Sequence, residues 1–484
     1  MNAPAITLPS GNDFADWLSP ILVKELRQGL KTRVFVSTFI VIQMVMILLT
    51  GLQLLSMAGG ADRGVMGAFD GFFWAFVWLP LLVLMPFRGL TAVSEEVKAN
   101  TLDLVQLTRL TSFRIVLGKW LALVAQTLLL VAAILPYAVL RYFFGEVDVV
   151  SDVTTIGYLL LSSFTLTAGA IALSSAPLAV RILALAVGLP TLLIAAASIS
   201  AMAAFSGRSS SSFFSPPDWV IWGVQILMTG MYLCLLLEIA AARIAPISEN
   251  HAVRKRLIAL GAALLSYILP LGLYQEDVIQ NWLLSAAVVW GWATVEALTE
   301  RTVLVPRVYH AFARRGLLGR LAGRVLYPGW ASGFVFACLL MVLVFGVFSL
   351  YGGVTNYASF AVSFVLGFTA VVAPVIVLLA FKKAKQPIWI YLLVQALCGL
   401  VFIIANIIAH FPNTREVDVM QWLAPIPMSA LLALLASSEA SVLLENTSAV
   451  SLLVCACVLG YLAIRAAMEF RVIAKLERDS LHQS

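Results

Sequence analysis

The sequence predicts an all-α polytopic membrane protein with about twelve transmembrane helices. Hydrophobic residues make up 61% of the 484 residues, and charged residues make up only 12%, about half the fraction of a typical soluble domain. Apolar runs of about twenty residues recur along the whole chain, and each is long enough to cross a bilayer core of roughly 30 Å. These observations exclude a water-soluble fold.

The apolar runs place the predicted spans in chain order. They lie at 35–57, 72–87, 120–143, 156–178, 182–204, 219–241, 257–274, 280–298, 331–351, 357–381, 388–411 and 448–468. A further apolar piece, 422–436, is too short for a crossing and has two prolines near its start. It predicts a re-entrant segment on the outer side, at about 420–445.

The distribution of basic residues predicts the orientation. With twelve crossings and both termini cytoplasmic, 27 of the 31 Lys and Arg residues fall on the cytoplasmic side. The four on the outer side are Arg63, Arg141, Arg208 and Arg415. Counting 422–436 as a crossing would move the basic C-terminal tail to the outer side. The positive-inside rule therefore favours twelve spans.

Twelve spans divide into two six-helix halves, residues 1–250 and 251–484. Each half has a cytosolic segment of about thirty residues between its second and third spans, which is typical of parallel repeats. The two halves share almost no residue similarity, so a true duplication stays open. The second connector, 299–330, is rich in arginine, and its simplest interpretation is a basic loop that faces lipid.

The N-terminal stretch 17–33 predicts an amphipathic helix that lies in the inner membrane interface. Leu18, Ile21, Leu22, Leu26 and Leu30 share one helical face, and Lys24, Arg27, Gln28 and Lys31 share the other. Pro20 falls near the first turn, where a helix tolerates proline. A simple basic anchor that sets the orientation is equally compatible with these residues.

The segment 94–119 is the longest polar interruption in the first half. It begins with Glu95 and Glu96 and ends with Gly118 and Lys119, directly before the next span. Between them, closely spaced apolar residues alternate with Thr, Gln and Arg, a pattern that suits helical pieces at a membrane surface with one face free for a partner. The residues alone favour a plain cytosolic loop.

This segment resembles the cytosolic connection between the second and third spans of ABC-2 type transporter permeases, the membrane-spanning subunits of ABC exporters. In that family an acidic pair, a Thr-Leu-Asp-Leu step, a Leu-Thr turn and a Gly-Lys entry recur in this order, and all are found here. The stretch that contains Pro20, Lys24, Glu25 and Arg27 likewise resembles the interfacial helix of the family. The short apolar piece before the last span resembles its outer hairpin.

The resemblance implies that this chain docks on a separate ABC ATPase subunit, which would bind ATP and Mg²⁺. The residues that it assigns to this coupling are Glu95, Glu96, Thr101, Leu102, Asp103, Leu104, Leu107, Thr108 and Arg109. It implies a multi-pass permease of a bacterial inner membrane that is not itself an enzyme and binds no cofactor. The substrate, the direction of transport and a second permease copy in the complex stay open.

The sequence contains no motif for soluble-type catalysis. It has no GxxxxGK[ST] phosphate loop, no HExxH motif and no Gly-x-Ser-x-Gly elbow, and its four histidines are scattered. The five cysteines lie within apolar runs, as small hydrophobic residues do. We therefore expect no catalytic residue, no metal site and no nucleic-acid partner.

Polar residues within the spans separate the remaining alternatives. No charged residue lies at mid-span, which counts against an ion-coupled secondary transporter. Uncharged polar residues lie deeper, and we expect them to form interhelical hydrogen bonds rather than a substrate path. They are Gln43, Gln126, Gln225, Gln395 and Asn406. A non-transporting membrane anchor for an ATPase stays open as well.

Overall fold

The computed structural model is helical throughout the part of the chain that it describes. The described residues are 20–59, 63–92, 111–143, 149–177, 181–182, 219–246, 249–272, 276–302, 306–352, 357–381, 387–409, 426–427 and 440–482. Within them, ten helices are long and apolar enough to cross a membrane. The prediction of an all-α, multi-pass membrane protein is thereby confirmed, and the count of twelve spans stays a prediction.

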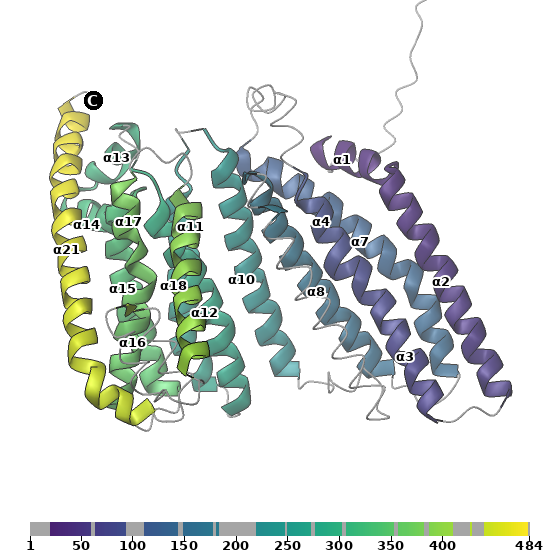
Figure 1. Ribbon diagram of the computed structural model, residues 1–484. Coiled ribbons are helices and arrows are strands. Elements are labelled where there is room, and N and C mark those ends of the chain that lie inside the picture. The colour runs from purple at the N-terminus through teal and green to yellow at the C-terminus, as the bar shows by residue number, and fades with distance from the viewer. Residues whose placement is uncertain are drawn as a thin grey trace, which may run out of the picture. The chain divides into compact units, whose positions relative to one another are not determined.

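The chain divides into two compact units (Figure 1). Unit 1 consists of Met1–Trp222 and Ala240–Ile244, and unit 2 consists of Gly223–Ile239 and Ala245–Ser484. The helix α10 (Trp219–Ile244) therefore contributes to both units. The predicted halves, with their boundary at residue 250, stay a prediction.

Unit 1 is a bundle of long apolar helices with one short helix at its end. Its elements are α1 (Pro20–Leu30), α2 (Arg33–Ala58), α3 (Arg63–Trp78), η1 (Leu79–Leu84), α4 (Met85–Gly89), α7 (Ser112–Phe143) and α8 (Val149–Ser174). The short helix α1 lies across the ends of the bundle and packs against the first turns of α7, while α4 packs against α8 (Figure 1). The helix α7 begins eight residues before the span predicted at 120–143.

The second span of unit 1 contains a π-helical turn, η1, which includes Pro80 and ends two residues before Pro86. Proline has no backbone N–H, so the regular α-helical hydrogen-bond ladder is interrupted there. The N–H of Met85 donates to the carbonyl of Pro80, five residues earlier. The hydroxyl of Ser163 on α8 donates to the Leu81 carbonyl at 2.7 Å. A neighbouring helix thus satisfies backbone that has no access to water.

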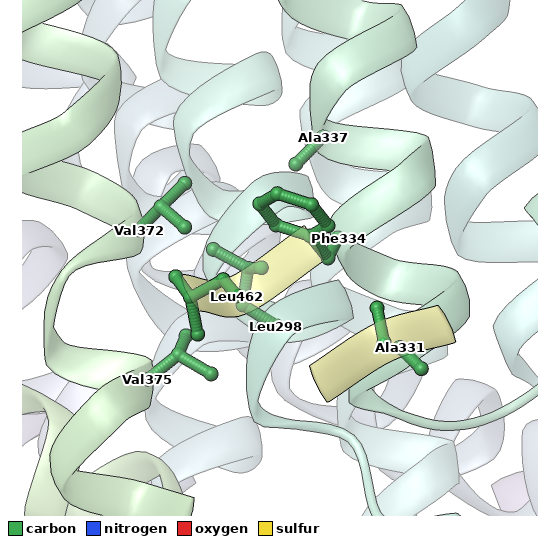
Figure 2. Close-up of a cluster of buried hydrophobic side chains, with 8 residues drawn as sticks. Leu298, Ala331, Phe334, Ala337, Val372, Val375 and Leu462 are labelled. Atoms are coloured by element: carbon green, nitrogen blue, oxygen red, sulfur yellow. The ribbon is translucent and has the colours of Figure 1, made fainter. Parts of the chain in front are cut away.

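Unit 2 is built around the long helices α12, α15 and α21. Its elements are α11 (Ala252–Ile268), η3 (Leu269–Gly272), α12 (Glu276–Thr299), α13 (Pro306–Ala313), α14 (Gly316–Leu326), α15 (Trp330–Tyr351), α16 (Tyr357–Val372), α17 (Pro374–Ala380), α18 (Pro387–Ala409) and α21 (Ala440–His482). Figure 2 shows the core in which Leu298, Phe334, Val372 and Leu462 meet from four of these helices.

Some predicted segments lie partly outside the described residues, and others differ from the helices in their extent. The span predicted at 182–204 lies outside the described residues apart from Ile182, and the span predicted at 257–274 corresponds to α11 and η3. The re-entrant segment predicted at 420–445 is described only at 426–427 and at 440–445. Residues 440–445 form the first turns of α21. That helix has 43 residues and extends beyond its predicted span at both ends.

The prediction of a loop at 299–330 was wrong, because the chain forms α13 and α14 there. The aromatic rings of Tyr309 and Tyr327 pack edge to face, with centroids 4.7 Å apart, and both belong to a buried cluster that includes Ile473 of α21. The Tyr327 hydroxyl also donates to Glu477 at 2.7 Å. The arginines dominate the composition of this connector, but the tyrosines between them provide the packing that makes it helical.

A proline break separates α16 from α17. Pro374 cannot donate to the carbonyl of Ala370, four residues earlier, and the side-chain amide of Gln395 on α18 donates to it instead at 2.8 Å. The hydroxyl of Tyr391, also on α18, donates to the Val371 carbonyl at 2.7 Å. The interhelical hydrogen bond expected of Gln395 is confirmed, and so is that of Gln43, which donates to the Ala133 carbonyl at 3.0 Å.

We predict that Gln395→Leu lowers the free energy of unfolding by about 1–2 kcal/mol, because it leaves a buried carbonyl without a donor. In a Pro374→Ala background the same substitution should cost less, since the restored N–H of residue 374 can reach the Ala370 carbonyl. Chemical denaturation of the four purified proteins in one detergent measures the difference. An equal cost in both backgrounds would contradict the assigned role of Gln395.

Candidate functional site

The predicted ATPase-coupling residues lie outside the described residues, because the structure resumes only at Thr111 after Ala92. They are Glu95, Glu96, Thr101, Leu102, Asp103, Leu104, Leu107, Thr108 and Arg109. The segment joins the end of α4 to the start of α7. The described site therefore consists of the two flanks of this segment and of the helix that lies beside them, α1.

The helix expected over 17–33 is present as α1, which begins at Pro20. Lys24 and Arg27 are exposed, and Glu25 is half-buried. The helix packs closely on α7, because a Cβ atom at Gly118 would lie only 2.9 Å from Cγ2 of Ile21. A larger residue than glycine at position 118 would push the two helices apart.

An ion pair joins α1 to the start of α7. The Lys119 ammonium lies 3.0 Å from a carboxylate oxygen of Glu25, and their side chains are 4% and 23% exposed. Lys119 closes the predicted coupling segment, and Glu25 belongs to the predicted interfacial helix. The sequence analysis singled out both residues, but it did not predict that they form a pair, because 94 positions separate them.

Arg88 connects the other flank of the segment to the same place. It lies in the last turn of α4, and its guanidinium donates to the side chain of Gln126 on α7. It also donates to the Gly29 carbonyl and the Thr32 hydroxyl, both at 3.3 Å. The interhelical hydrogen bond expected of Gln126 is confirmed, whereas the role of Arg88 was not predicted.

The geometry of unit 1 thus links α1 to both ends of the segment 93–110. Arg88 holds the helix before the segment, and Lys119 holds the helix after it. A force on this segment would be passed to α1, α4 and α7 together. The arrangement can therefore transmit movement from the segment to these helices.

Unit 2 has a buried charge cluster where the start of α11 meets the end of α12. Lys255 lies 3.4 Å from Glu296 and 2.6 Å from Glu300, and Arg256 lies 2.7 Å from Glu300. The guanidinium of Arg256 also donates to the Val325 carbonyl at 2.6 Å and to the Gly329 carbonyl at 3.3 Å. The cluster therefore joins α11 and α12 to the connection between α14 and α15.

A histidine lies between two carboxylates next to this cluster. Nδ1 of His251 is 2.8 Å from Glu238, and Nε2 is 3.0 Å from Glu249. Arg254 reaches the second oxygen of Glu238 at 3.2 Å. Burial lowers the pKa of the imidazole, but the hydrogen bonds and charges of Glu238 and Glu249 outweigh it and raise the pKa above its usual value.

A pocket of about 750 Å³ opens in unit 2 beside the core shown in Figure 2. Leu298 and Val375 belong both to that core and to the pocket wall. Its other lining residues are Thr299, Glu300, Arg301, Thr302, Trp330, Leu378, Leu379, Phe381, Pro387, Arg465, Met468, Glu469 and Val472. The sequence gave no indication of this pocket, because its walls come from five separate stretches of the chain.

Side chains that could ligate a metal are scattered among the described residues. Among them, no group of three or more His, Cys, Asp or Glu side chains is placed to hold a metal ion. Comparison with protein-family models, curated proteins and solved structures found no match to this chain.

We predict that Glu25→Gln lowers the free energy of unfolding by about 2 kcal/mol. This value lies between those of fully buried and exposed ion pairs, because Lys119 would remain buried while Glu25 is partly exposed. The exposed neighbour Lys24 provides the control, and Lys24→Gln should change the free energy of unfolding by less than about 0.5 kcal/mol. The charge swap Glu25→Lys with Lys119→Glu should recover part of the loss, and no recovery would contradict the pairing.

A pH dependence follows from the raised pKa of His251. The protonated imidazole donates to both carboxylates, so its stabilisation is fully present below a pH of about 6.5 and is lost as the pH rises through the folded-state pKa. The stability difference between the native protein and His251→Gln should therefore be largest near pH 6 and should shrink toward pH 9. Thermal unfolding across this range measures it, with His310→Gln on α13 as the control. A difference that grows with pH would contradict the assignment.

Proposed function

We propose that this chain is the permease subunit of an ABC-2 type transporter. It moves a substrate of unknown identity across the membrane with ATP that a separate ATPase subunit hydrolyses. The observation that carries the proposal is the ion pair between Lys119 and Glu25. It joins the two stretches of sequence that resemble the family, the interfacial helix and the end of the coupling segment.

In this mechanism the ATPase pulls on the segment 94–119. Glu95 and Glu96 face basic residues of the ATPase, and Leu102, Leu104 and Leu107 fill a groove on it. Closure of the ATPase moves the segment, and the contacts of Arg88 and Lys119 pass the movement to α1, α4 and α7. ATP and Mg²⁺ stay on the partner, and the chain binds no cofactor itself.

The charge pattern supports the same orientation in both units. Basic residues concentrate on one side of the predicted spans, which we assign to the cytoplasm of a bacterial inner membrane, together with both termini. The complex would contain this chain and the ATPase, with one or two copies of the permease.

Buried carboxylates of the spans favour this function over an ion-coupled carrier. Asp152 is paired with Arg141 at 3.2 Å, and Glu296 is paired with Lys255. Glu238 contacts both His251 and Arg254. A carboxylate that already holds a cationic side chain is a poor site for a transported proton or sodium ion.

Purification from native membranes tests the proposal. We expect a soluble ATPase to copurify with the tagged protein, and Glu95→Lys with Glu96→Lys should abolish this association while leaving membrane insertion intact. The matched control reverses another adjacent acidic pair, Glu276 and Asp277, which lies on the predicted outer side. The variant with this second pair reversed should still copurify with the ATPase.

Two results would argue against the proposal. The protein could be isolated without an ATPase, or with one that is indifferent to Glu95 and Glu96, and either result favours an ion-coupled carrier or a non-transporting membrane anchor. An ATPase that binds through these residues but shows no substrate-stimulated hydrolysis would identify a membrane anchor.

A further inference from the structure

The pocket of unit 2 has one apolar wall and one charged wall. The apolar wall comes from α17, through Val375, Leu378 and Leu379, and from α21, through Met468 and Val472. All five side chains are apolar, and none offers a hydrogen-bond donor. Such a wall suits a hydrocarbon chain.

The two carboxylates of the charged wall are already engaged. Glu300 is held by Lys255 at 2.6 Å and by Arg256 at 2.7 Å. Glu469 accepts a hydrogen bond from the Thr302 hydroxyl. The negative charge of Glu300 is thus offset by buried cations behind it, and it contributes little to the field inside the pocket.

The two arginines of the charged wall are different. Arg301 follows the end of α12, and Arg465 lies on α21. Within the described part of the chain, neither side chain forms a hydrogen bond or an ion pair, although both line the pocket. Two guanidinium groups therefore provide donors for an anion, and they do so directly beside an apolar wall.

The helix α14 indicates the depth of this end of unit 2 in the membrane. Its Leu317 and Leu318 side chains are 75% and 80% exposed, and exposed arginines stand beside them at 320 and 324. Exposed leucines next to arginines are typical of a helix at the level of the lipid headgroups. Arg256 joins the Val325 carbonyl of this helix to Glu300 of the pocket, so the pocket belongs to the same level.

We propose that the pocket binds an anionic phospholipid from the adjacent leaflet. The phosphate lies between Arg301 and Arg465, and an acyl chain lies along α17 and α21. The volume of about 750 Å³ suits a headgroup and the first part of its chains. A zwitterionic headgroup would bring its own cation beside the two arginines along with its phosphate, and a free phosphate would leave the apolar wall uncovered. This inference does not depend on the proposed ATPase.

Native mass spectrometry of the full-length protein tests the site, with phosphatidylglycerol and phosphatidylcholine as probes. We expect the native protein to retain phosphatidylglycerol preferentially. Arg301→Gln with Arg465→Gln should reduce this preference about 25-fold, or about fivefold for each arginine. The control, Arg314→Gln with Arg315→Gln, removes two exposed arginines outside the pocket and should keep the preference.

The outcomes separate the possible sources of the phosphate. Equal retention of the two lipids by the native protein, or an equal loss in the pocket and control variants, would overturn the proposal. Displacement of the lipid by inorganic phosphate at millimolar concentration would also overturn it, because the site would then recognise phosphate alone. Thermal unfolding of each variant shows whether it is folded. If the double variant is unfolded, Arg465→Gln alone should still reduce the preference about fivefold, and an unchanged preference would overturn the proposal.

Discussion

Charged side chains that are buried between apolar helices need a partner, and this constraint organises both units. Removing an ion from water costs several kcal/mol even after the protein relaxes, so an unpaired charge would unfold its surroundings or lose its proton. Lys119 meets Glu25, Arg141 meets Asp152, and Arg256 meets Glu300. Each pair connects two helices, and the pairing thereby decides which helices are neighbours at the ends of the bundles.

The same constraint applies to the backbone. Where proline removes an N–H from a helix, a carbonyl is left without a donor, and lipid offers none. In unit 2 the amide of Gln395 supplies the donor for Ala370, and in unit 1 the hydroxyl of Ser163 reaches Leu81 within the π-helical turn. Each break is therefore also a place where a neighbouring helix donates a hydrogen bond to the backbone. They allow α17 to form a separate wall of the pocket.

Local features of the sequence were enough to predict the fold class. A span such as α15 is recognised by its length and apolar composition alone, without knowledge of its neighbours. Features that depend on distant residues were missed. The partner of Lys119 lies 94 positions away, and α13 and α14 are stabilised by a buried cluster that contains Tyr309, Tyr327 and Ile473. The coupling role of the residues from Glu95 to Arg109 is a prediction from sequence resemblance, because they lie outside the described residues.

The basic residues of unit 2 fall into two groups, those buried in ion pairs and those that line the pocket. Lys255 and Arg256 are almost fully buried, and their contacts leave them little freedom to meet a ligand. Arg301 is exposed and Arg465 is half-buried, so water can solvate them when the pocket is empty. A guanidinium in such a place stays hydrated in the ligand-free protein, so its desolvation costs little free energy. It forms a strong hydrogen bond when an anion replaces the water. Selection for stability alone would not require two such groups beside an apolar wall, whereas recognition of an anionic amphiphile would.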